Sequence, residues 1–511
     1  MAARKDSPSD SDRGSSLDPS AEEIRRWGNA AIKAMADYHG SIRERRLYPQ
    51  TTAHQIRERL ERALPAEGSD FETVLATFQD AIVELSRHNA HPRMFGYVQA
   101  PGAAIAAFAD LLASMLNANL TAWRSAPAAV ELERLTINWI TKMLGYDRNS
   151  AGLFVSGGST ANLAALAAAR RAKASEELLS KGVRSLPQEM RVYVSEETHH
   201  SVAKAAALLG IGRENVRIVR VDERFKIRID DLVAKIDEDL KAGHLPFCVV
   251  ANAGTVMTGA VDPLAEMSGI AQQFNLWMHV DACYGGFAAM AKSVRPLFHS
   301  IDKADSVALD PHKWLYLPVD YGCILYRAPE TARATFAHEA EYTRVIAQEA
   351  EEAFAFWDYG PELSRRFRAL KVWMLLKSVG VRTLSKAIEK DLACARHFEQ
   401  LVQASDDFEM LAPVELSIFC FRHLPVRMKQ ALASANENTR RQVNEELDSM
   451  NERLLVELQR DGSSYLSNAL IHGRFALRGC VMNYRTTSHD MEILLNDLRR
   501  VARRLKVKVS V

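Results

Sequence analysis

A lysine flanked by a histidine and a tryptophan follows an apolar run in the stretch "ALDPHKWLYLP", residues 308–318. The run "SVALD" (306–310) predicts a buried strand, so His312 and Lys313 are expected on the turn at its end. Such surroundings can lower the pKa of an amine and make it a nucleophile. The alternative is an ordinary lysine on a solvated loop.

The segment "SGGSTAN" (156–162) has the composition of a turn between a strand and a helix. Its two glycines and its Ser-Thr pair place backbone N–H groups at a helix N-terminus, a geometry that binds phosphate. Ser159 can add a hydroxyl group and also cap the helix. A plain glycine turn with a serine cap is the simpler interpretation of this segment alone. No Gly-Lys-Ser/Thr follows, so the segment is not a Walker loop.

Two further segments place polar side chains at expected strand ends. The strand in "LWMHVDACYGG" (276–286) ends in Asp281, and a carboxylate at the carboxyl end of a parallel strand faces the ligand crevice. The alternative is that Asp281 caps the next turn. The segment "YVSEETHHSVAKAA" (193–206) carries His199 and His200 between a strand and a helix. Adjacent histidines rarely face one ion, and no HExxH or nearby cysteine accompanies them, so no metal site is predicted.

Together, these four segments contain the parts that a phosphorylated pyridine aldehyde requires. Lys313 would bond to the aldehyde, Asp281 would keep the pyridine nitrogen protonated, and an imidazole would stack on the ring. The helix N-terminus would take the phosphate. An interpretation of all four segments as turns and caps leaves their order unexplained. The sequence therefore predicts a site for pyridoxal 5'-phosphate.

The composition is that of an ordinary globular protein: 511 residues, 47% of them hydrophobic and 25% charged. A formal net charge of +1 gives no support for binding to nucleic acid or to an anionic membrane. The six cysteines form no CxxC pair, which favours a reducing, cytoplasmic location over a disulfide scaffold. The N-terminus lacks the apolar core of a signal peptide, and the most apolar long segment, 103–116, is too short to span a bilayer.

The elements that must position these residues follow an alternating pattern. Apolar runs predict buried strands, and helical segments fall between several of them, which favours a largely parallel sheet covered on both faces. The runs are 151–155, 191–195, 216–221, 247–254, 276–282, 306–310 and 322–327. The predicted organisation is a disordered tail (1–20), an N-terminal helical segment (21–95), a large domain (96–385) and a small α+β domain (386–511). In the small domain, 429–460 is expected to be helical and 475–486 to form either a strand pair or a strand and turn.

The motifs "SGGSTAN", "HHSVAKA", "HVDACYGG" and "DPHKW", in this order, resemble the group II pyridoxal-phosphate-dependent amino-acid decarboxylases. The likeness runs from about residue 85 to the C-terminus. This family includes aromatic-amino-acid, histidine, glutamate and cysteine-sulfinate decarboxylases. The resemblance implies an α/β protein of fold type I, similar to aspartate aminotransferase. It also implies α-decarboxylation of an L-amino acid to the amine and CO2, in a homodimer with active sites at the subunit interface.

The resemblance also implies roles for individual residues. Lys313 would carry the cofactor, Asp281 would pair with the pyridine nitrogen and His199 would stack on the ring. Gly158, Ser159 and His312 are implied to hold the phosphate, and Thr255 is implied to lie near the ring. Tyr97, Asn119 and Thr121 are implied to contact the substrate. Tyr342 matches the spacing of a catalytic tyrosine on a mobile loop, and it would serve the partner's site.

Two departures from the family pattern leave questions open. Asp310 stands where many members have asparagine, and an acid close to a phosphate has no evident role. Asn119 and Thr121 are polar where the animal aromatic-amino-acid decarboxylases have apolar contacts. An aromatic substrate is favoured, but glutamate, aspartate and cysteine sulfinate stay open as alternatives. An aldehyde synthase or an aminotransferase on the same scaffold is a further alternative.

Overall fold

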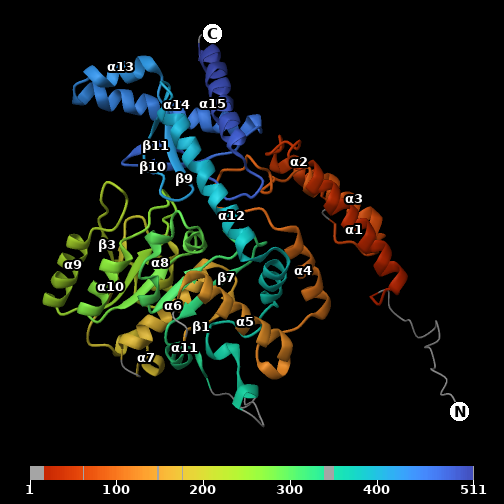
Figure 1. Cartoon of the computed structure of the whole chain (residues 1–511), viewed down its shortest axis with the longest axis vertical. Helices are drawn as coiled ribbons and strands as arrows, with labels where there is room; N and C mark the ends of the chain where they lie inside the picture. The colour runs from red at the N-terminus through yellow and green to blue at the C-terminus, as the bar shows by residue number, and fades with distance from the viewer. Residues whose placement is uncertain (1–16, 61–62, 147–148, 175–176, 339–349, 510–511) are drawn as a thin grey trace.

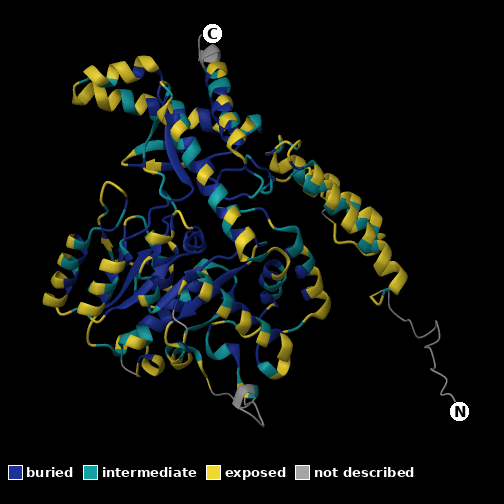
Figure 2. Cartoon of the chain, viewed as in Figure 1, coloured by how far each residue is buried: buried dark blue, intermediate teal, exposed yellow. Residues whose placement is uncertain are grey.

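The computed structural model describes residues 17–60, 63–146, 149–174, 177–338 and 350–509. Figure 1 shows an arm of N-terminal helices, a large body built around a sheet, and a smaller C-terminal part connected to the body by the long helix α12. Figure 2 shows that the strands of the body are buried, whereas the arm is largely exposed. The predicted tail (1–20) falls mostly outside the described residues.

A seven-stranded sheet in the order β1-β7-β6-β5-β4-β2-β3 forms the centre of the body. The strands from β3 to β6 in this order run parallel, and β7 is antiparallel to both β1 and β6. The strands are β1 (Ala151–Val155), β2 (Met190–Ser195), β3 (Val216–Val219), β4 (Leu245–Asn252), β5 (Trp277–Asp281), β6 (Ser306–Leu309) and β7 (Gly322–Tyr326). This mostly parallel sheet confirms the predicted fold class.

One strand is less buried than its sequence predicts. The run 216–221 predicts a fully buried strand, but β3 lies at the edge of the sheet, where Ile218 is 51% exposed. An edge strand has a neighbour on one side only, so part of its surface stays in contact with water.

Helices cover the sheet and bring their termini to its edges. They are α4 (Ala104–Leu116), α5 (Pro127–Leu144), α6 (Gly158–Lys173), α7 (Glu177–Lys181), α8 (Ser201–Leu208), α9 (Ile229–Lys241), α10 (Leu264–Gln273) and α11 (Pro329–Phe336). A proline occupies the first turn of α5, and Gly145 ends this helix at φ 73°, a left-handed conformation that glycine adopts without strain. The buried face of α6 is rich in alanine, which lets the helix approach the sheet closely.

The C-terminal part has a four-stranded antiparallel sheet in the order β10-β11-β9-β8. Its elements are α12 (Ala369–Gln403), β8 (Phe408–Met410), β9 (Ile418–His423), α13 (Val426–Ser434), α14 (Glu437–Asp461), β10 (Ser467–Ile471), β11 (Arg474–Cys480) and α15 (Ser488–Val509). The predicted boundary between 385 and 386 lies within α12, which breaks at Gly380 (φ 73°, ψ 160°).

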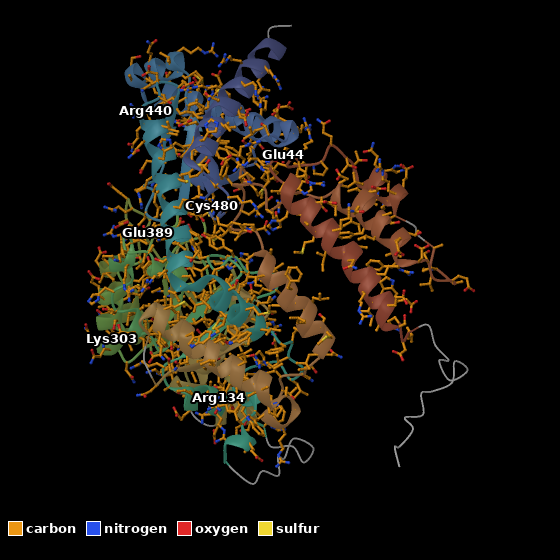
Figure 3. The ribbon with its side chains drawn as sticks, turned by 45° about the vertical axis from the view of Figure 1, so that its right-hand side comes forward. Glu44, Arg134, Lys303, Glu389, Arg440 and Cys480 are labelled. Atoms are coloured by element: carbon orange, nitrogen blue, oxygen red, sulfur yellow. The ribbon has the colours of Figure 1, made fainter. Side chains whose placement is uncertain are left out.

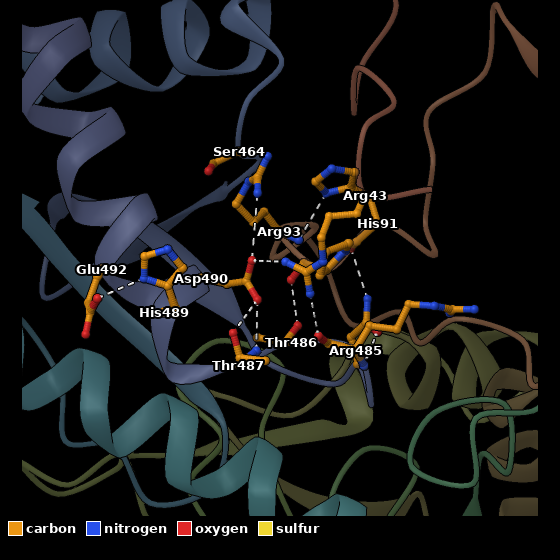
Figure 4. Close-up of polar contacts among 12 residues, drawn as sticks. Arg43, His91, Arg93, Ser464, Arg485, Thr486, Thr487, His489, Asp490 and Glu492 are labelled. Carbon is orange, nitrogen blue, oxygen red and sulfur yellow. Dashed lines mark hydrogen bonds and ion pairs between the residues drawn. The ribbon is translucent and has the colours of Figure 1, made fainter. Parts of the chain in front are cut away.

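The N-terminal arm consists of α1 (Ala21–Ser41), α2 (Ala53–Arg59) and α3 (Phe71–Thr77), and none of these helices has a buried residue. A polar cluster fixes the base of the arm to the C-terminal part (Figure 4). The buried carboxylate of Asp490 accepts a hydrogen bond from Arg43 at 2.8 Å and caps the start of α15 by accepting from the Thr487 backbone N–H at 2.9 Å. Arg93 lies 3.8 Å from the same carboxylate. Within the described ranges, no helix is long and apolar enough to cross a membrane.

A buried acid on α12 predicts a pH-dependent stability. Asp391 is fully buried, and burial raises its pKa to about 7, although the Tyr316 hydroxyl donates to it at 2.9 Å. Between about pH 4 and pH 7 the folded state therefore holds a proton that the unfolded chain releases, so stability falls as pH rises through this window. Asp391→Asn removes this dependence. The melting temperature of the variant relative to wild type is expected to rise between pH 5 and pH 8, as measured by calorimetry.

The exposed Asp406 on the loop that follows α12 provides the matched control. Asp406→Asn should leave the difference in melting temperature constant over the same pH range. A constant difference for Asp391→Asn as well would show that Asp391 is ionised throughout.

Candidate active site

A cavity of about 620 Å³ opens at the carboxyl ends of β4, β5 and β6, beside the N-terminus of α6. Ligands of open α/β sheets bind at this edge. The structure brings the residues predicted to hold the cofactor together here, along with the predicted substrate residue Tyr97. The cofactor residues that line the cavity are Lys313, Asp281, His199, Gly158, Ser159, Thr255 and His312.

The amine of Lys313 is paired with the carboxylate of Asp310, with Nζ 3.0 Å from Oδ2. Burial alone would lower the pKa of Lys313, but the charge and hydrogen bond of Asp310, together with Cys283 and Asp281, outweigh burial, so this pKa is raised. The sequence-based expectation of a lowered pKa is therefore wrong for this state of the protein. The physical reason is an acid three residues before the lysine, one turn away.

Asp310 lies between the lysine and the N-terminus of α6. It is 4% exposed, and its Oδ1 has no hydrogen-bond partner among the described residues. A Cβ on Gly158 would come within 3.0 Å of Asp310 Oδ2 and 2.5 Å of Cys283 Sγ, so only glycine fits at this position. The His312 ring donates from Nδ1 to the Tyr321 carbonyl at 2.7 Å, and its Nε2 lies 3.9 Å from Asp310 Oδ2. Burial lowers the pKa of His312.

Asp281, at the end of β5, is held ionised by two hydrogen bonds. Burial raises the pKa of Asp281. His279, the Asn162 amide (Nδ2 to Oδ2, 2.8 Å) and the Cys283 backbone N–H (3.1 Å to Oδ1) together lower it by more than burial raises it, so the net shift of this pKa is downward. His279 is fully buried, and burial lowers its own pKa to about 4. At neutral pH the hydrogen bonds, rather than an imidazolium, therefore keep Asp281 charged.

A directed chain of hydrogen bonds begins behind Asp281. The Trp277 indole N–H donates to the Ser306 hydroxyl oxygen at 2.9 Å, which leaves the Ser306 proton for His279 Nδ1, also at 2.9 Å. The proton of neutral His279 is then on Nε2, which donates to the Asn162 carbonyl at 3.0 Å. Asn162 uses its amide protons for Asp281 and for the Ser201 hydroxyl, at 2.8 and 2.9 Å.

The same chain fixes the protonation of His199. The Ser201 hydroxyl is 2.7 Å from His199 Nδ1, and the Ser201 backbone N–H donates to the same nitrogen at 3.3 Å. Nδ1 is therefore an acceptor, and neutral His199 carries its proton on Nε2. Burial lowers the pKa of His199, which favours this neutral form. Asn162 and Ser201 stand within "SGGSTAN" and "HHSVAKA", but the sequence reasoning gave them no role.

The C-terminal part closes the other side of the cavity with Ser467, Asn468 and Arg478. Arg478 is 4% exposed and donates to the carbonyls of Val256 and Met257, the latter at 3.1 Å, and to the Ser467 hydroxyl at 3.3 Å. No carboxylate in the described part of the chain forms an ion pair with it. This buried cation escaped the sequence reasoning, although an arginine within the apolar run "FALRGC" was a signal for it.

Two of the predicted substrate residues, Asn119 and Thr121, do not line this cavity. Asn119 accepts a hydrogen bond from the Arg365 backbone N–H at 2.8 Å, and the Thr121 hydroxyl bonds to Ser125 at 3.2 Å. Both stand on the connection between α4 and α5, so their contact with substrate stays a prediction. Tyr342 lies outside the described residues. Thr255, in contrast, lies in the cavity wall, with its hydroxyl 3.0 Å from that of Thr258.

The residues present fit pyridoxal phosphate. The N-terminus of α6 has a glycine cap, and no side chain of the described residues forms a capping hydrogen bond there, which suits a phosphate. Asp281 is buried, and its pKa is lowered, which suits a protonated pyridine nitrogen. Lys313 supplies an amine within the same cavity. No three His, Cys, Asp or Glu side chains are grouped to hold a metal ion anywhere in the described residues.

The Asp310–Lys313 pair predicts slow uptake of the cofactor at neutral pH. An amine must lose its proton before it attacks an aldehyde, and Asp310 stabilises the charged form. Asp310→Asn should therefore speed the reconstitution of apoenzyme with pyridoxal phosphate at pH 7 and move the pH midpoint of that rate downward. The measurement is stopped-flow absorbance between pH 6 and pH 9, and an unchanged midpoint would remove Asp310 from this role.

The chain matches the model of the pyridoxal-dependent decarboxylase conserved domain over residues 53–424. It is 33% identical over 491 residues to an aromatic-L-amino-acid decarboxylase of Bacillus atrophaeus, with 96% of this chain and 98% of that protein covered. It is 30% identical over 494 residues to a phenylacetaldehyde synthase of Petunia hybrida, with 95% of each covered.

The structure of Oryza sativa TDC with PLP and tryptamine superposes with a TM-score of 0.86 at 27% identity, covering 95% of this chain and 99% of that one. The predicted fold type I architecture is confirmed by such neighbours. The cofactor of the family is pyridoxal phosphate, as the sequence predicts. This chain therefore belongs to the pyridoxal-dependent decarboxylase family.

Proposed function

We propose that this protein removes the α-carboxyl group of an aromatic L-amino acid, releasing CO2 and leaving the amine. The observation that carries this proposal is the single cavity that joins Lys313, an ionised Asp281 and a neutral His199. When bound, pyridoxal phosphate supplies a ring that can take up the electron pair of the broken C–C bond.

The residues of the chain have separate tasks in this proposal. Lys313 would hold the cofactor through its side-chain amine. Asp281 keeps a proton on the ring nitrogen, and the hydrogen bonds from Asn162 and Cys283 keep Asp281 ionised while it does so. His199, held by Ser201 at its Nδ1, would pack against the cofactor ring. The N-terminus of α6 binds the phosphate through its backbone N–H groups.

The choice of an aromatic substrate rests on the relatives. The Bacillus atrophaeus protein is an aromatic-L-amino-acid decarboxylase, and the Oryza sativa structure contains tryptamine. One observation favours an acidic substrate as the second candidate: Arg478 places a positive charge in the cavity wall, unpaired with any carboxylate of the described residues. A carboxylate on the substrate side chain would be attracted to this charge.

The test is CO2 release and amine formation by the purified holoenzyme with each of the twenty amino acids, DOPA, 5-hydroxytryptophan and cysteine sulfinate. An aromatic amino acid is expected to give the highest kcat/KM. The largest value with glutamate, aspartate or cysteine sulfinate would establish the second candidate instead. Keto-acid formation without CO2 would refute decarboxylation and identify an aminotransferase.

We further propose that Tyr342 returns a proton to the carbon that has lost CO2, as the family resemblance implies. Tyr342→Phe should then change the product. An unprotonated carbon can react with O2, so that amino acid, O2 and water yield aldehyde, CO2, ammonia and hydrogen peroxide. The measurement is the yield of amine and aldehyde, together with oxygen uptake. Tyr359→Phe is the control and should leave the product unchanged. Amine as the only product of Tyr342→Phe, at an undiminished rate, would exclude Tyr342 as the proton donor.

We also propose that the protein acts as a cytoplasmic homodimer. The arm and α4 expose apolar side chains that a second copy of the chain would bury: Ile24, Ile32, Val74, Leu111, Leu112, Met115 and Leu116. Figures 1 and 2 show that the arm extends away from its own body, with its surface exposed.

The six unpaired cysteines suit a reducing compartment such as the cytoplasm. Light scattering should give twice the mass of the 57.0 kDa chain, whereas a monomer at micromolar concentration would contradict the dimer.

A further inference from the structure

A second cavity of about 890 Å³ shares no lining residue with the active-site cavity. The C-terminal half of α5, the segment after β5 around 290–295 and the middle of α12 surround it. In Figure 3, Glu389 of this cavity lies on the side of the molecule that faces away from the arm helices α1–α3. None of the residues that line this cavity belongs to the exposed apolar set of the arm and α4.

The wall of this second cavity carries an excess of positive charge. Six cationic side chains line it, and none forms an ion pair with a carboxylate of the described residues: Lys142, Lys292, Arg295, Lys377, Arg382 and Lys386. The one acid, Glu389, accepts from the Ser293 backbone N–H at 3.0 Å and from the Ser293 hydroxyl at 2.6 Å. The protein therefore does not neutralise these cations itself, although like charges gathered in one place repel.

The floor of the cavity is apolar. Its lining includes Trp139, Met143, Met290, Leu376 and Val381. Met290 is buried, and Trp139 is half-buried and lines the cavity. An apolar floor under a cationic rim is suited to a ligand with an apolar body and negatively charged ends. A merely solvated basic surface would not need this floor.

The walls are fixed before any ligand binds. The Ser385 hydroxyl donates to the Met290 carbonyl at 2.8 Å, and the Ser293–Glu389 bonds tie the same segment to α12 a turn further on. The break of α12 at Gly380 lies between Leu376 and Val381, and its φ of 73° requires glycine. Both halves of the broken helix thus contribute side chains to one preformed cavity.

We propose that this cavity binds a small amphiphilic anion, with an aromatic or aliphatic body and at least two negative groups such as phosphates or carboxylates. The volume lies within the range of small-ligand sites in proteins, roughly 300–1,000 Å³. The proposal is independent of the reaction at Lys313, because no residue of the catalytic cavity contributes to it.

The first test uses 8-anilinonaphthalene-1-sulfonate, a fluorescent aromatic anion, added to the holoenzyme. Its fluorescence is expected to rise on binding and to be reversed by adenosine triphosphate, which has an aromatic body and several charges. Inorganic pyrophosphate, which has charge but no body, should compete at least tenfold more weakly. Equal competition by pyrophosphate would overturn the proposal that the ligand needs an apolar body. Displacement of the dye by an amino-acid substrate would place the dye in the catalytic cavity and overturn the proposal of a second binding site.

The second test reverses charges in the cavity. Lys142→Glu with Arg382→Glu should weaken dye binding at least tenfold, because two attractions become repulsions. Arg213→Glu with Lys241→Glu, which are exposed elsewhere on the body, should change it less than twofold. All four positions are on the surface, and an unchanged kcat for decarboxylation verifies that each variant is folded. Unchanged dye affinity in the first pair would overturn the proposal.

Discussion

Lys313→Ala is expected to abolish both the visible absorbance of the lysine-bound cofactor and all turnover. Lys313 is the only lysine among the described residues that line the cavity, so no other amine of this wall can replace it. The effect on rate should be total, because the substituted side chain is the covalent anchor and not a stabilising contact. The variant should still bind pyridoxal phosphate, since the α6 N-terminus and Asp281 remain.

Three measurements separate the anchor from a structural role. Absorbance reports the covalent linkage, equilibrium dialysis reports cofactor binding without it, and CO2 release reports turnover. Lys204→Ala, an exposed lysine on α8, is the matched control and should leave all three unchanged. A visible band together with CO2 release from Lys313→Ala would assign the anchor to another residue.

The sheet could be predicted largely from its apolar runs. The segments that became β2, β4, β5 and β6 are short and apolar, and turns or helices bound them, as parallel buried strands require. That β7 runs antiparallel to both neighbours could not be read from the sequence, since an apolar run has the same composition in either direction. The short strands β8 and β10 were missed, because β10 buries Ser467 and exposes Leu470, so its apolar residues do not alternate as in a half-buried strand, and β8 has three residues only.

The site could be predicted as far as local motifs reach. Lys313, Asp281 and His199 stand at strand ends, and the topology of a parallel sheet brings such ends together. Arg478 could not be placed, because its position depends on how the C-terminal sheet packs against the body. The raised pKa of Lys313 depends on a contact with Asp310, and a motif does not reveal side-chain distances.

The hydrogen-bond chain behind Asp281 shows why the remaining part of the site needed a structure. Trp277 and His279 lie on β5, Ser306 on β6, Asn162 on α6 and Ser201 on α8, four elements far apart in sequence. Each of these residues alone reads as a buried polar group with an ordinary partner. Only their mutual distances show that the bonds run in one direction, from the indole to the imidazole of His199.

Asp281→Ala is expected to slow decarboxylation by about two to three orders of magnitude or more and to weaken cofactor binding, because the ring nitrogen loses its charged partner. Alanine also leaves the Asn162 amide and the Cys283 N–H without an acceptor, which costs about 1–3 kcal/mol of stability for each group. Asp281→Asn separates the two effects: its carbonyl still accepts from Cys283, but the charge is gone. Both variants should lose the rate, and Asp281→Ala should lose more melting temperature, because Asp281→Asn leaves only the Asn162 amide without an acceptor.

Asn162→Ala completes the comparison at Asp281. It keeps the carboxylate but removes a hydrogen bond that lowers the pKa of Asp281 and a donor to Ser201. The acidic limb of its kcat profile should therefore move to higher pH, since the carboxylate is protonated more easily, while the rate on the plateau falls by about tenfold at most. The measurements are kcat against pH at saturating cofactor and cofactor affinity by dialysis. A nearly wild-type rate in Asp281→Asn would mean that a different acid pairs with the ring nitrogen. An unshifted pH profile in Asn162→Ala would mean that the hydrogen bond from Asn162 does not control the ionisation of Asp281.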